Sequence, residues 1–457
     1  MVRLLAEIMH IRKIKGSGSI EDFPYETFSV KVRIKGSSKK TIKTPKGIKG
    51  KTMSIKRPFL KDWMVKRGDL IVLNADETKQ CITELGIQGK AKKWKGFTKK
   101  DIDSDGYKEI LFNNPFITAV LSPYYGARLY QLFNKGSHKN ELYGGCYYKQ
   151  KGYVELGGIE ETLGKHGKPD RLWNTSYTLK STKGKNTLTF ITKIKEEKGL
   201  SIEKKFSFFK TFPGLVNTVR FHFKPAKTKK KNKKEKKQKK KIALTQRIFF
   251  AIGGIPNYMN LYHIPEKSGL HTIRFNKPLY KRGWDDSAWW EWQHCHFTPE
   301  PGLIILENEL SHEILIIFFS TSKLNYLWTG DKNKTPRMHI TYRETKIEPR
   351  KEKEYITVVA TGNCYCFSNQ QLLFVSKGSI TGYSTPLSFV FYSQSDKERK
   401  ILIDTGSTIK TIKMKRLRKI KDIQGRIFYY TMVAKNDINE INATVADTEL
   451  KVRLHLE

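Results

Sequence analysis

Residues 101–132 read DIDSDGYKEILFNNPFITAVLSPYYGARLYQL, and this is the most informative stretch of the chain. It opens with a carboxylate at every second position and continues through Gly106 to Glu109. It then runs into two strand-like segments joined by SPYYGA, and such turn residues between alternating apolar runs are typical of antiparallel β structure. The stretch therefore predicts an acidic loop that leads directly into the first strands of an all-β domain.

The acidic loop has the composition of a calcium site. Hard oxygen ligands at this density suit Ca²⁺, and a glycine permits the tight turn. The loop is not an EF-hand, because Phe112 stands where that motif has its twelfth-position Glu. We predict a structural Ca²⁺, with an acidic turn that holds no metal as the alternative. The candidate ligands are Asp101, Asp103, Asp105 and Glu109.

The composition is that of a folded protein, with 38% hydrophobic and 12% aromatic residues in 457. No run of about 18 apolar residues occurs, so no membrane span is expected. Five scattered cysteines indicate a reducing compartment. The first residues lack the pattern of a signal peptide, so we predict a cytoplasmic location.

The charge is strongly positive, because 86 Lys and Arg stand against 44 Asp and Glu, a balance of +42. Such a field attracts polyanions such as RNA. The alternative is a bias toward Lys that serves only solubility. Either way, the acidic loop at residues 101–109 is an exception in this chain.

Residues 1–92 alternate in the manner of strands, as in FSVKVRIKG (residues 28–36). Several short strands of this kind predict a small basic β-barrel, OB-like or SH3-like. A Lys-rich linker follows at residues 93–100.

Residues 101–375 contain many strand-like runs, such as EILIIFFS (residues 313–320), and almost no helical periodicity. They predict a large antiparallel two-sheet supersandwich. Within them, 12 of the 18 residues at 224–241 are Lys, which predicts a disordered loop. Residues 376–457 alternate again and predict a small β-sandwich. The predicted fold class is therefore mainly β, with a supersandwich flanked by an N-terminal barrel and a C-terminal sandwich.

The stretch at 101–132 resembles the start of the all-β C-terminal domain of archaeal-type α-amylases and 4-α-glucanotransferases. That domain belongs to the galactose-mutarotase-like supersandwich class. GYVELGGIEETLG (residues 152–164) and FPGLVNTVRFHF (residues 212–223) are also similar to it. The resemblance covers about residues 101–375 and implies a supersandwich fold and a carbohydrate-related role.

The resemblance brings no catalytic site. The sequence has no amylase catalytic domain, and the His-x-Tyr-x-Asn type sequence of mutarotases is not found in it. We therefore assign no catalytic residue and predict the fold without the chemistry. A sugar mutarotase or epimerase remains a third, weaker hypothesis.

A Trp-rich stretch, GWDDSAWWEWQHCHF at residues 283–297, is the candidate carbohydrate-binding site. Aromatic faces stack on sugars while carboxylates orient the hydroxyl groups. The alternative is a pair of strands that bury these tryptophans in a core. The candidate residues are Trp284, Asp285, Asp286, Trp289, Trp290, Glu291 and Trp292.

Two basic clusters are candidates for contact with a polyanion, because their cations alternate with aromatic or apolar residues. The residues are Lys92, Lys93, Trp94 and Lys95 in the first cluster and Lys413, Lys415, Arg416 and Arg418 in the second.

Two function hypotheses follow. The first is a non-catalytic carbohydrate-interacting protein with a polysaccharide or glucan partner, in a binding or accessory role. The second is an RNA- or ribosome-associated protein that uses the sandwich as a scaffold.

Overall fold

The computed structural model describes the strands between Val2 and Lys100 and, with gaps, residues 108–456. The longest gaps after residue 108 are 164–171, 225–238 and 275–298. Strands joined by antiparallel pairing dominate the described residues, which include no α-helix. The mainly β fold class predicted from the sequence is confirmed.

The N-terminal strands form a five-stranded sheet. In order across the sheet they are β5 (Thr52–Lys56), β4 (Thr27–Ile34), β1 (Val2–Ile14), β6 (Leu70–Ala75) and β7 (Ile82–Gln88). β2 (Ser19–Ile20) and β3 (Phe23–Pro24) pair with each other. No pairing among the described strands joins β5 to β7, so closure of this sheet into the expected barrel stays a prediction.

The first large sheet has nine strands. In order they are β26 (Leu324–Lys332), β27 (Thr335–Tyr342), β21 (Leu244–Phe249), β15 (Ile159–Leu163), β11 (Arg128–Asn134), β10 (Ile117–Ser122), β9 (Glu109–Asn113) and β8 (Phe97–Lys100), and β12 (Lys139–Asn140) pairs with β11. The strands predicted on both sides of SPYYGA are thus β10 and β11, which pair directly.

The second large sheet also has nine strands. In order they are β16 (Thr178–Lys183), β17 (Thr187–Lys193), β18 (Leu200–Phe208), β19 (Gly214–Phe223), β29 (Glu352–Gly362), β25 (Ile314–Phe319), β24 (Leu303–Asn308), β22 (Asn260–Glu266) and β23 (Gly269–Arg274). Short elements outside the large sheets are β13 (Gly144–Gln150), β14 (Tyr153–Gly157), β20 (Lys240–Ile242), β28 (Thr345–Ile347), η3 (Ile252–Gly254) and η6 (Thr321–Lys323). β20 begins at Lys240, so the Lys-rich segment ends within a strand.

The two large sheets pack face to face on the main hydrophobic core. Alternate residues of a strand point to opposite faces, and on β18 this places Ile202, Phe206 and Phe208 in the core. Burial of each such side chain contributes about 1.5–3 kcal/mol. The alternating pattern along the chain therefore determines which face of each sheet meets the other, as a sandwich requires.

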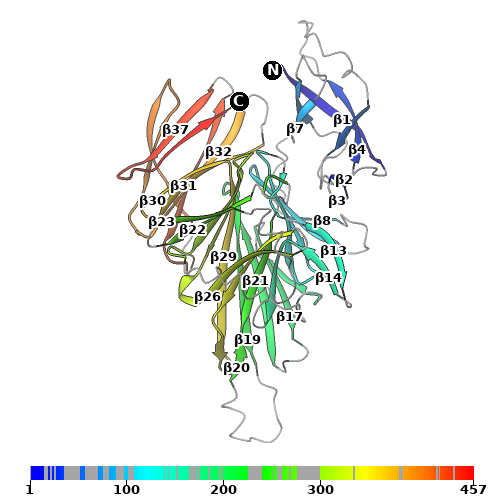
Figure 1. The fold of residues 1–457 in the computed structure, drawn as a ribbon, viewed down its shortest axis with the longest axis vertical. Coiled ribbons are helices and arrows are strands. Elements are labelled where there is room, and N and C mark those ends of the chain that lie inside the picture. The colour runs from blue at the N-terminus through cyan, green and yellow to red at the C-terminus, as the bar shows by residue number, and fades with distance from the viewer. Residues whose placement is uncertain are drawn as a thin grey trace, which may run out of the picture.

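The C-terminal strands form two further sheets. The third sheet is β30 (Cys364–Ser368), β31 (Gln371–Lys377), β32 (Ser384–Ser393), β36 (Arg426–Lys435) and β35 (Lys415–Arg416), and the fourth is β34 (Ile409–Lys413), β33 (Lys400–Asp404), β37 (Glu440–Val445) and β38 (Lys451–His455). A second core joins the third sheet to the outer face of the second, and a third core lies between the last two sheets. These sheets lie at one end of the two large sheets (Figure 1).

Gly158 positions β15 in the first large sheet. Its φ is +76°, and a Cβ there would lie 2.3 Å from the carbonyl oxygen of Leu129 on β11. Only glycine permits both this backbone conformation and this close approach. Gly158 is therefore required for β15 to join β11. β15 carries the adjacent acids Glu160 and Glu161.

Candidate functional site

A row of polar residues crosses the first large sheet on the face that points away from the main core. Glu160 on β15 is in register with Arg247 on β21, and Arg247 is in register with His339 on β27. Because Ile159 and Glu161 flank Glu160 on β15 and Ile159 lies in the main core, Glu160 points to the opposite face. We call Arg128, Glu160, Arg247 and His339 the polar row.

Glu160 lies between two guanidinium groups. Its Oε2 is 2.7 Å from Nη1 of Arg128, and its Oε1 is 3.3 Å from Nη1 of Arg247. The side chains are almost fully buried, with exposed fractions of 0% for Arg128, 2% for Glu160 and 3% for Arg247. Arg128 Nε also donates to the carbonyl oxygen of Tyr125 at 2.8 Å. Charged groups buried to this extent are held in place by their partners.

Among the described residues, three neutral side chains on the same face lack a hydrogen-bond partner. The Ser122, Gln131 and Thr162 side chains are buried, and no partner for their polar atoms occurs in the part of the chain that the structure describes. Ser122 is in register with Arg128, and Thr162 lies two residues after Glu160 on β15. An unsatisfied buried polar group costs about 1–3 kcal/mol, so natural folds keep few of them. Three on one face beside the polar row suggest that a ligand completes them.

Apolar side chains lie beside this polar surface. Leu111, Val120, Tyr130 and Phe133 form a small cluster that is separate from the main core, with Tyr125 packed against it. On the other side, the guanidinium carbon of Arg247 lies 5.0 Å from the centre of the Phe249 ring. The face thus combines aromatic surface, charged groups and neutral hydrogen-bonding groups, which is the combination that sugar recognition requires.

Glu161, next to Glu160, belongs to a second buried network inside the main core. Its carboxylate pairs with Lys204 of the second large sheet and accepts a hydrogen bond from Asn217 Nδ2 at 2.9 Å. Lys204 Nζ also donates to the carbonyl oxygen of Gly126 at 2.9 Å. Burial lowers the pKa of Lys204 more than Glu161 raises it. This pair links the two large sheets directly behind the polar row.

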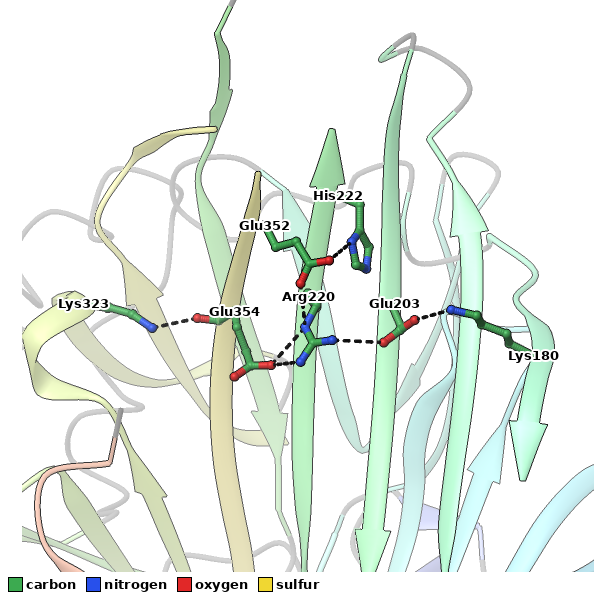
Figure 2. Close-up of polar contacts among 7 residues, drawn as sticks. All are labelled: Lys180, Glu203, Arg220, His222, Lys323, Glu352 and Glu354. Carbon is green, nitrogen blue, oxygen red and sulfur yellow. Dashed lines mark hydrogen bonds and ion pairs between the residues drawn. The ribbon is translucent and has the colours of Figure 1, made fainter. Parts of the chain in front are cut away.

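A contrasting charged network lies on the outer face of the second large sheet (Figure 2). Arg220 Nη1 is 3.6 Å from Glu203 Oε1, and Arg220 also pairs with Glu354. The Arg220 side chain is 33% exposed, so water screens these ion pairs and each contributes little. This network therefore differs from the polar row in both its sheet and its exposure to water. Its members are Lys180, Glu203, Arg220, His222, Lys323, Glu352 and Glu354.

Most of the site residues predicted from the sequence lie outside the described residues. These are Asp101, Asp103, Asp105, Lys92, Lys93, Trp94, Lys95, Arg418 and the seven residues from Trp284 to Trp292. The Trp-rich site and the structural Ca²⁺ therefore stay predictions. No group of three or more potential metal ligands occurs among the described residues.

Glu109, the fourth predicted calcium ligand, is described. It is the first residue of β9, only 1% exposed, and in register with Lys100 on β8. Ile110, the residue after Glu109, is in register with Leu121 of β10, and the next residue of β10, Ser122, is in register with Arg128. Glu109 therefore extends the polar row toward the sheet edge.

The second predicted polyanion cluster is split between two sheets. Lys413 ends β34 and lies 2.5 Å from Glu398, while Arg416 on β35 lies 3.1 Å from Asp396. Lys415 is exposed on β35. Two of the three described cations of this cluster therefore have acidic partners. Its described residues lie on the short strands β34 and β35.

The residues of the polar row were not singled out from the sequence. Arg128, Arg247 and His339 each stand alone in an ordinary strand pattern, and only cross-strand register brings them together. A usable signal was present for two of them, because a charged residue in a strand buried on both faces requires a partner. RLYQLFN, with Arg128, and LTQRIF, with Arg247, are such strands.

No family model matches the chain, and no curated protein matches it. Similar solved structures include a galactose mutarotase-like protein from Clostridium acetobutylicum (9% identity, TM-score 0.39, 58% of this chain and 98% of that one). A 4-alpha-glucanotransferase from Thermococcus litoralis (13%, 0.32, 58% and 39%) and an alpha-galactosidase from Geobacillus stearothermophilus (11%, 0.33, 59% and 41%) are also similar. The chain thus spans less than half the length of the last two.

These structures include the class that residues 101–132 resemble. Among the described residues, no helix is long and apolar enough to cross a membrane.

Proposed function

We propose that the protein binds carbohydrate on the polar row and its surrounding face, without catalysing a reaction on it. The observation that carries this proposal is the set of buried, unpartnered polar groups of Ser122, Gln131 and Thr162 in the described part of the chain. A sugar offers hydroxyl groups that both donate and accept, which is what an amide and two hydroxyls need. The apolar cluster around Tyr130 lies buried beside these groups.

The environment of Glu160 supports the non-catalytic part of the proposal. A general base must be free to take a proton from the reacting group. Glu160 instead contacts Arg128 and Arg247, one on each oxygen. Its charge therefore serves to position the two guanidinium groups.

The Trp-rich stretch with Trp289 and Trp290 remains a proposed part of the same function, with a glucan or another polysaccharide as partner. Replacement of both by Ala is expected to remove the polysaccharide-induced rise in melting temperature. A rise that is unchanged in this variant would exclude these residues from the binding site.

The test of the proposal uses Thr162→Val, which replaces the hydroxyl by a methyl of the same size. If the hydroxyl awaits a ligand, the free variant gains about 1 kcal/mol of stability, because an unsatisfied buried group is removed. Its affinity for glycans then falls. Unfolding in urea and calorimetric titration with a panel of neutral and acidic oligosaccharides measure the two effects.

The matched control is Thr357→Val. The Thr357 hydroxyl lies in the main core and donates to Gln246, so its loss is expected to destabilise the protein and leave glycan affinity unchanged. Loss of stability in Thr162→Val with unchanged affinity would contradict the proposal, as would failure of the wild-type protein to bind any glycan. Catalysed interconversion of glucose anomers, followed by NMR, would overturn the non-catalytic part.

A further inference from the structure

We infer that the C-terminal sandwich carries a second carbohydrate site, a solvent-facing pocket that takes a neutral sugar. The pocket has a volume of about 510 Å³, within the range of about 300–1,000 Å³ that is usual for small-molecule sites. It lies between two hairpin turns, one that joins β30 to β31 and one that joins β37 to β38. It is separate from the polar row, so this inference goes beyond the proposed function.

The turn between β30 and β31 forms the first wall of the pocket. Ser368 is in register with Gln371, so Asn369 and Gln370 are the two residues of the turn. Their φ values of +49° and +58° suit a type I′ turn, which requires positive φ at both central residues. The hairpin therefore holds the side chains of Ser368, Asn369 and Gln371 together at the wall.

The turn between β37 and β38 forms the second wall. The Thr448 hydroxyl donates to the carbonyl oxygen of Val445 at 2.8 Å and accepts from the Leu450 N–H at 3.2 Å, which fixes the turn. Leu450 is only 1% exposed and belongs to the third core, so the base of the pocket is rigid. β38 lies against β30 and β31, which holds the two turns side by side. Asp447 and Glu449 are exposed on either side of Thr448.

The two acids of the pocket stand out by their lack of a cation. Within the part of the chain that the structure describes, Asp447 and Glu449 take part in no ion pair, although the chain carries a balance of +42. The pocket thus presents two carboxylates that are available to a ligand with donor groups. The other acids described after residue 384 have partners: Asp396 pairs with Arg416 and Arg426, Glu398 with Lys413, and Glu440 with Arg453, while Asp404 accepts from the Gly406 N–H.

The rest of the lining complements these acceptors. The Ser368 hydroxyl and the amides of Asn369 and Gln371 can both donate and accept, whereas a carboxylate only accepts. Adjacent hydroxyl groups of a sugar ring also both donate and accept, so they can satisfy both kinds of lining group. The lining is mostly polar, which indicates a hydrophilic ligand.

Other ligand classes match the pocket less well. No cation lines it, and its two carboxylates repel anions, so nucleic acids and acidic sugars are directed to other parts of this basic protein. Ca²⁺ takes about six to eight oxygen ligands, and the described residues include no group of three or more potential metal ligands. An organic amine would pair with the carboxylates but would leave the amide N–H groups of the lining unused.

Hydrogen–deuterium exchange of the full chain locates the site. The probes are glucose, galactose, mannose and maltose, each at saturating concentration, with spermidine and calcium chloride as competing ligands. At least one sugar is expected to slow exchange in the turns around Asn369 and Thr448. Saturation-transfer NMR titration of the same sugar gives its dissociation constant.

The test variant is Asp447→Asn/Glu449→Gln, which keeps the size of both side chains and removes their charge. It is expected to weaken binding of the sugar in this pocket about tenfold or more, because hydrogen bonds to charged acceptors are the strong ones. The control is Glu398→Gln, which makes the same change on the same sandwich outside the pocket and is expected to leave binding unchanged. Thermal melting shows whether each variant folds, and the exchange measurement on the wild-type protein needs no variant.

The outcomes separate this inference from the proposed function. Slower exchange at the two turns that is lost in Asp447→Asn/Glu449→Gln and kept in Thr162→Val would support the inference, whatever happens at the polar row. No slowing at either turn, with sugar binding that Thr162→Val weakens, would overturn the inference and leave the proposed function standing. Slowing by spermidine or calcium chloride and by no sugar would overturn the ligand class. Failure of the wild-type protein to bind any sugar would overturn both proposals.

Discussion

Glu160 and Glu161 are adjacent on β15, yet their carboxylates reach buried cations on opposite faces of the first large sheet. Glu160 contacts Arg128 and Arg247 on the outer face, and Glu161 contacts Lys204 in the main core. β15 is therefore held from both sides. The position of the polar row therefore depends in part on the ion pair of Glu161 and Lys204 in the main core.

Lys204→Met is expected to destabilise the protein by about 3–5 kcal/mol, because it leaves the Glu161 carboxylate buried without its cation. The double variant Lys204→Met/Glu161→Leu is expected to recover part of this loss, because no charge then stays in the core. Urea unfolding of the two single variants and the double variant measures the coupling. If the double variant loses as much as the sum of the single variants, Lys204 and Glu161 are not coupled.

Glu141 predicts a pH dependence of stability. It accepts a hydrogen bond from the Gly253 N–H at 2.9 Å. Its pKa is raised well above the ordinary value of 4.5, mainly because it is buried and also because the negative charge of Glu313 is close. The folded protein therefore binds this proton more tightly than the unfolded chain does. The resulting stability is present below pH 4.5 and is lost as pH rises through the folded-state pKa.

Glu141→Gln keeps this side chain neutral at every pH and can still accept from Gly253. The variant is expected to match the wild-type protein near pH 4 and to be more stable at pH 8. Urea midpoints at pH 4, 6 and 8 measure the difference. A difference in urea midpoint between the two proteins that is the same at pH 4, 6 and 8 would show that Glu141 does not change its charge in this pH range.

Glu307 predicts the opposite sign. Burial would raise the pKa of Glu307, but hydrogen bonds with His263 and Tyr365 outweigh burial and lower the pKa. His263 Nε2 lies 2.9 Å from Glu307 Oε2, and the Tyr365 hydroxyl donates to the same oxygen at 2.8 Å. Stability from this group is present above the ordinary carboxyl pKa and is lost as pH falls through the folded-state value.

Tyr365→Phe removes one of these bonds to a charged acceptor and is expected to cost about 1.5 kcal/mol at pH 7. It raises the pKa of Glu307, so acid unfolding begins at higher pH than in the wild-type protein. Circular dichroism during acid titration measures the shift. An unchanged acid midpoint in a variant that is destabilised at pH 7 would mean that Tyr365 acts through packing alone.

Local patterns predicted the strands, while the polar row could not be predicted from them. EILIIFFS became β25 because a continuous run of branched and aromatic residues suits a strand buried on both faces. Arg128, Glu160 and Arg247 lie on strands that are distant in the sequence, and register between those strands is set by tertiary packing. The stretch at 101–132 predicted the first strands of the supersandwich correctly. Its acids were predicted as ligands, whereas Arg128, the first residue after the turn, was not predicted as a site residue.

Removal of the Lys-rich segment tests how much of the affinity for polyanions comes from this segment and how much from the rest of the protein. Residues 225–238 contain eight Lys and one Glu, whereas the following Lys239 and Lys240 already pair with Glu348 and Glu197. Replacement of residues 225–238 by a short Gly-Ser linker therefore removes seven positive charges and keeps these ion pairs. Poly(U) binding is expected to weaken and to depend less steeply on salt, because fewer phosphates are neutralised and fewer counterions released. The affinity for oligosaccharides is expected to stay the same, because the proposed function places their contacts on the face of the polar row. An equal loss of affinity for poly(U) and for oligosaccharides would place sugar binding on this segment.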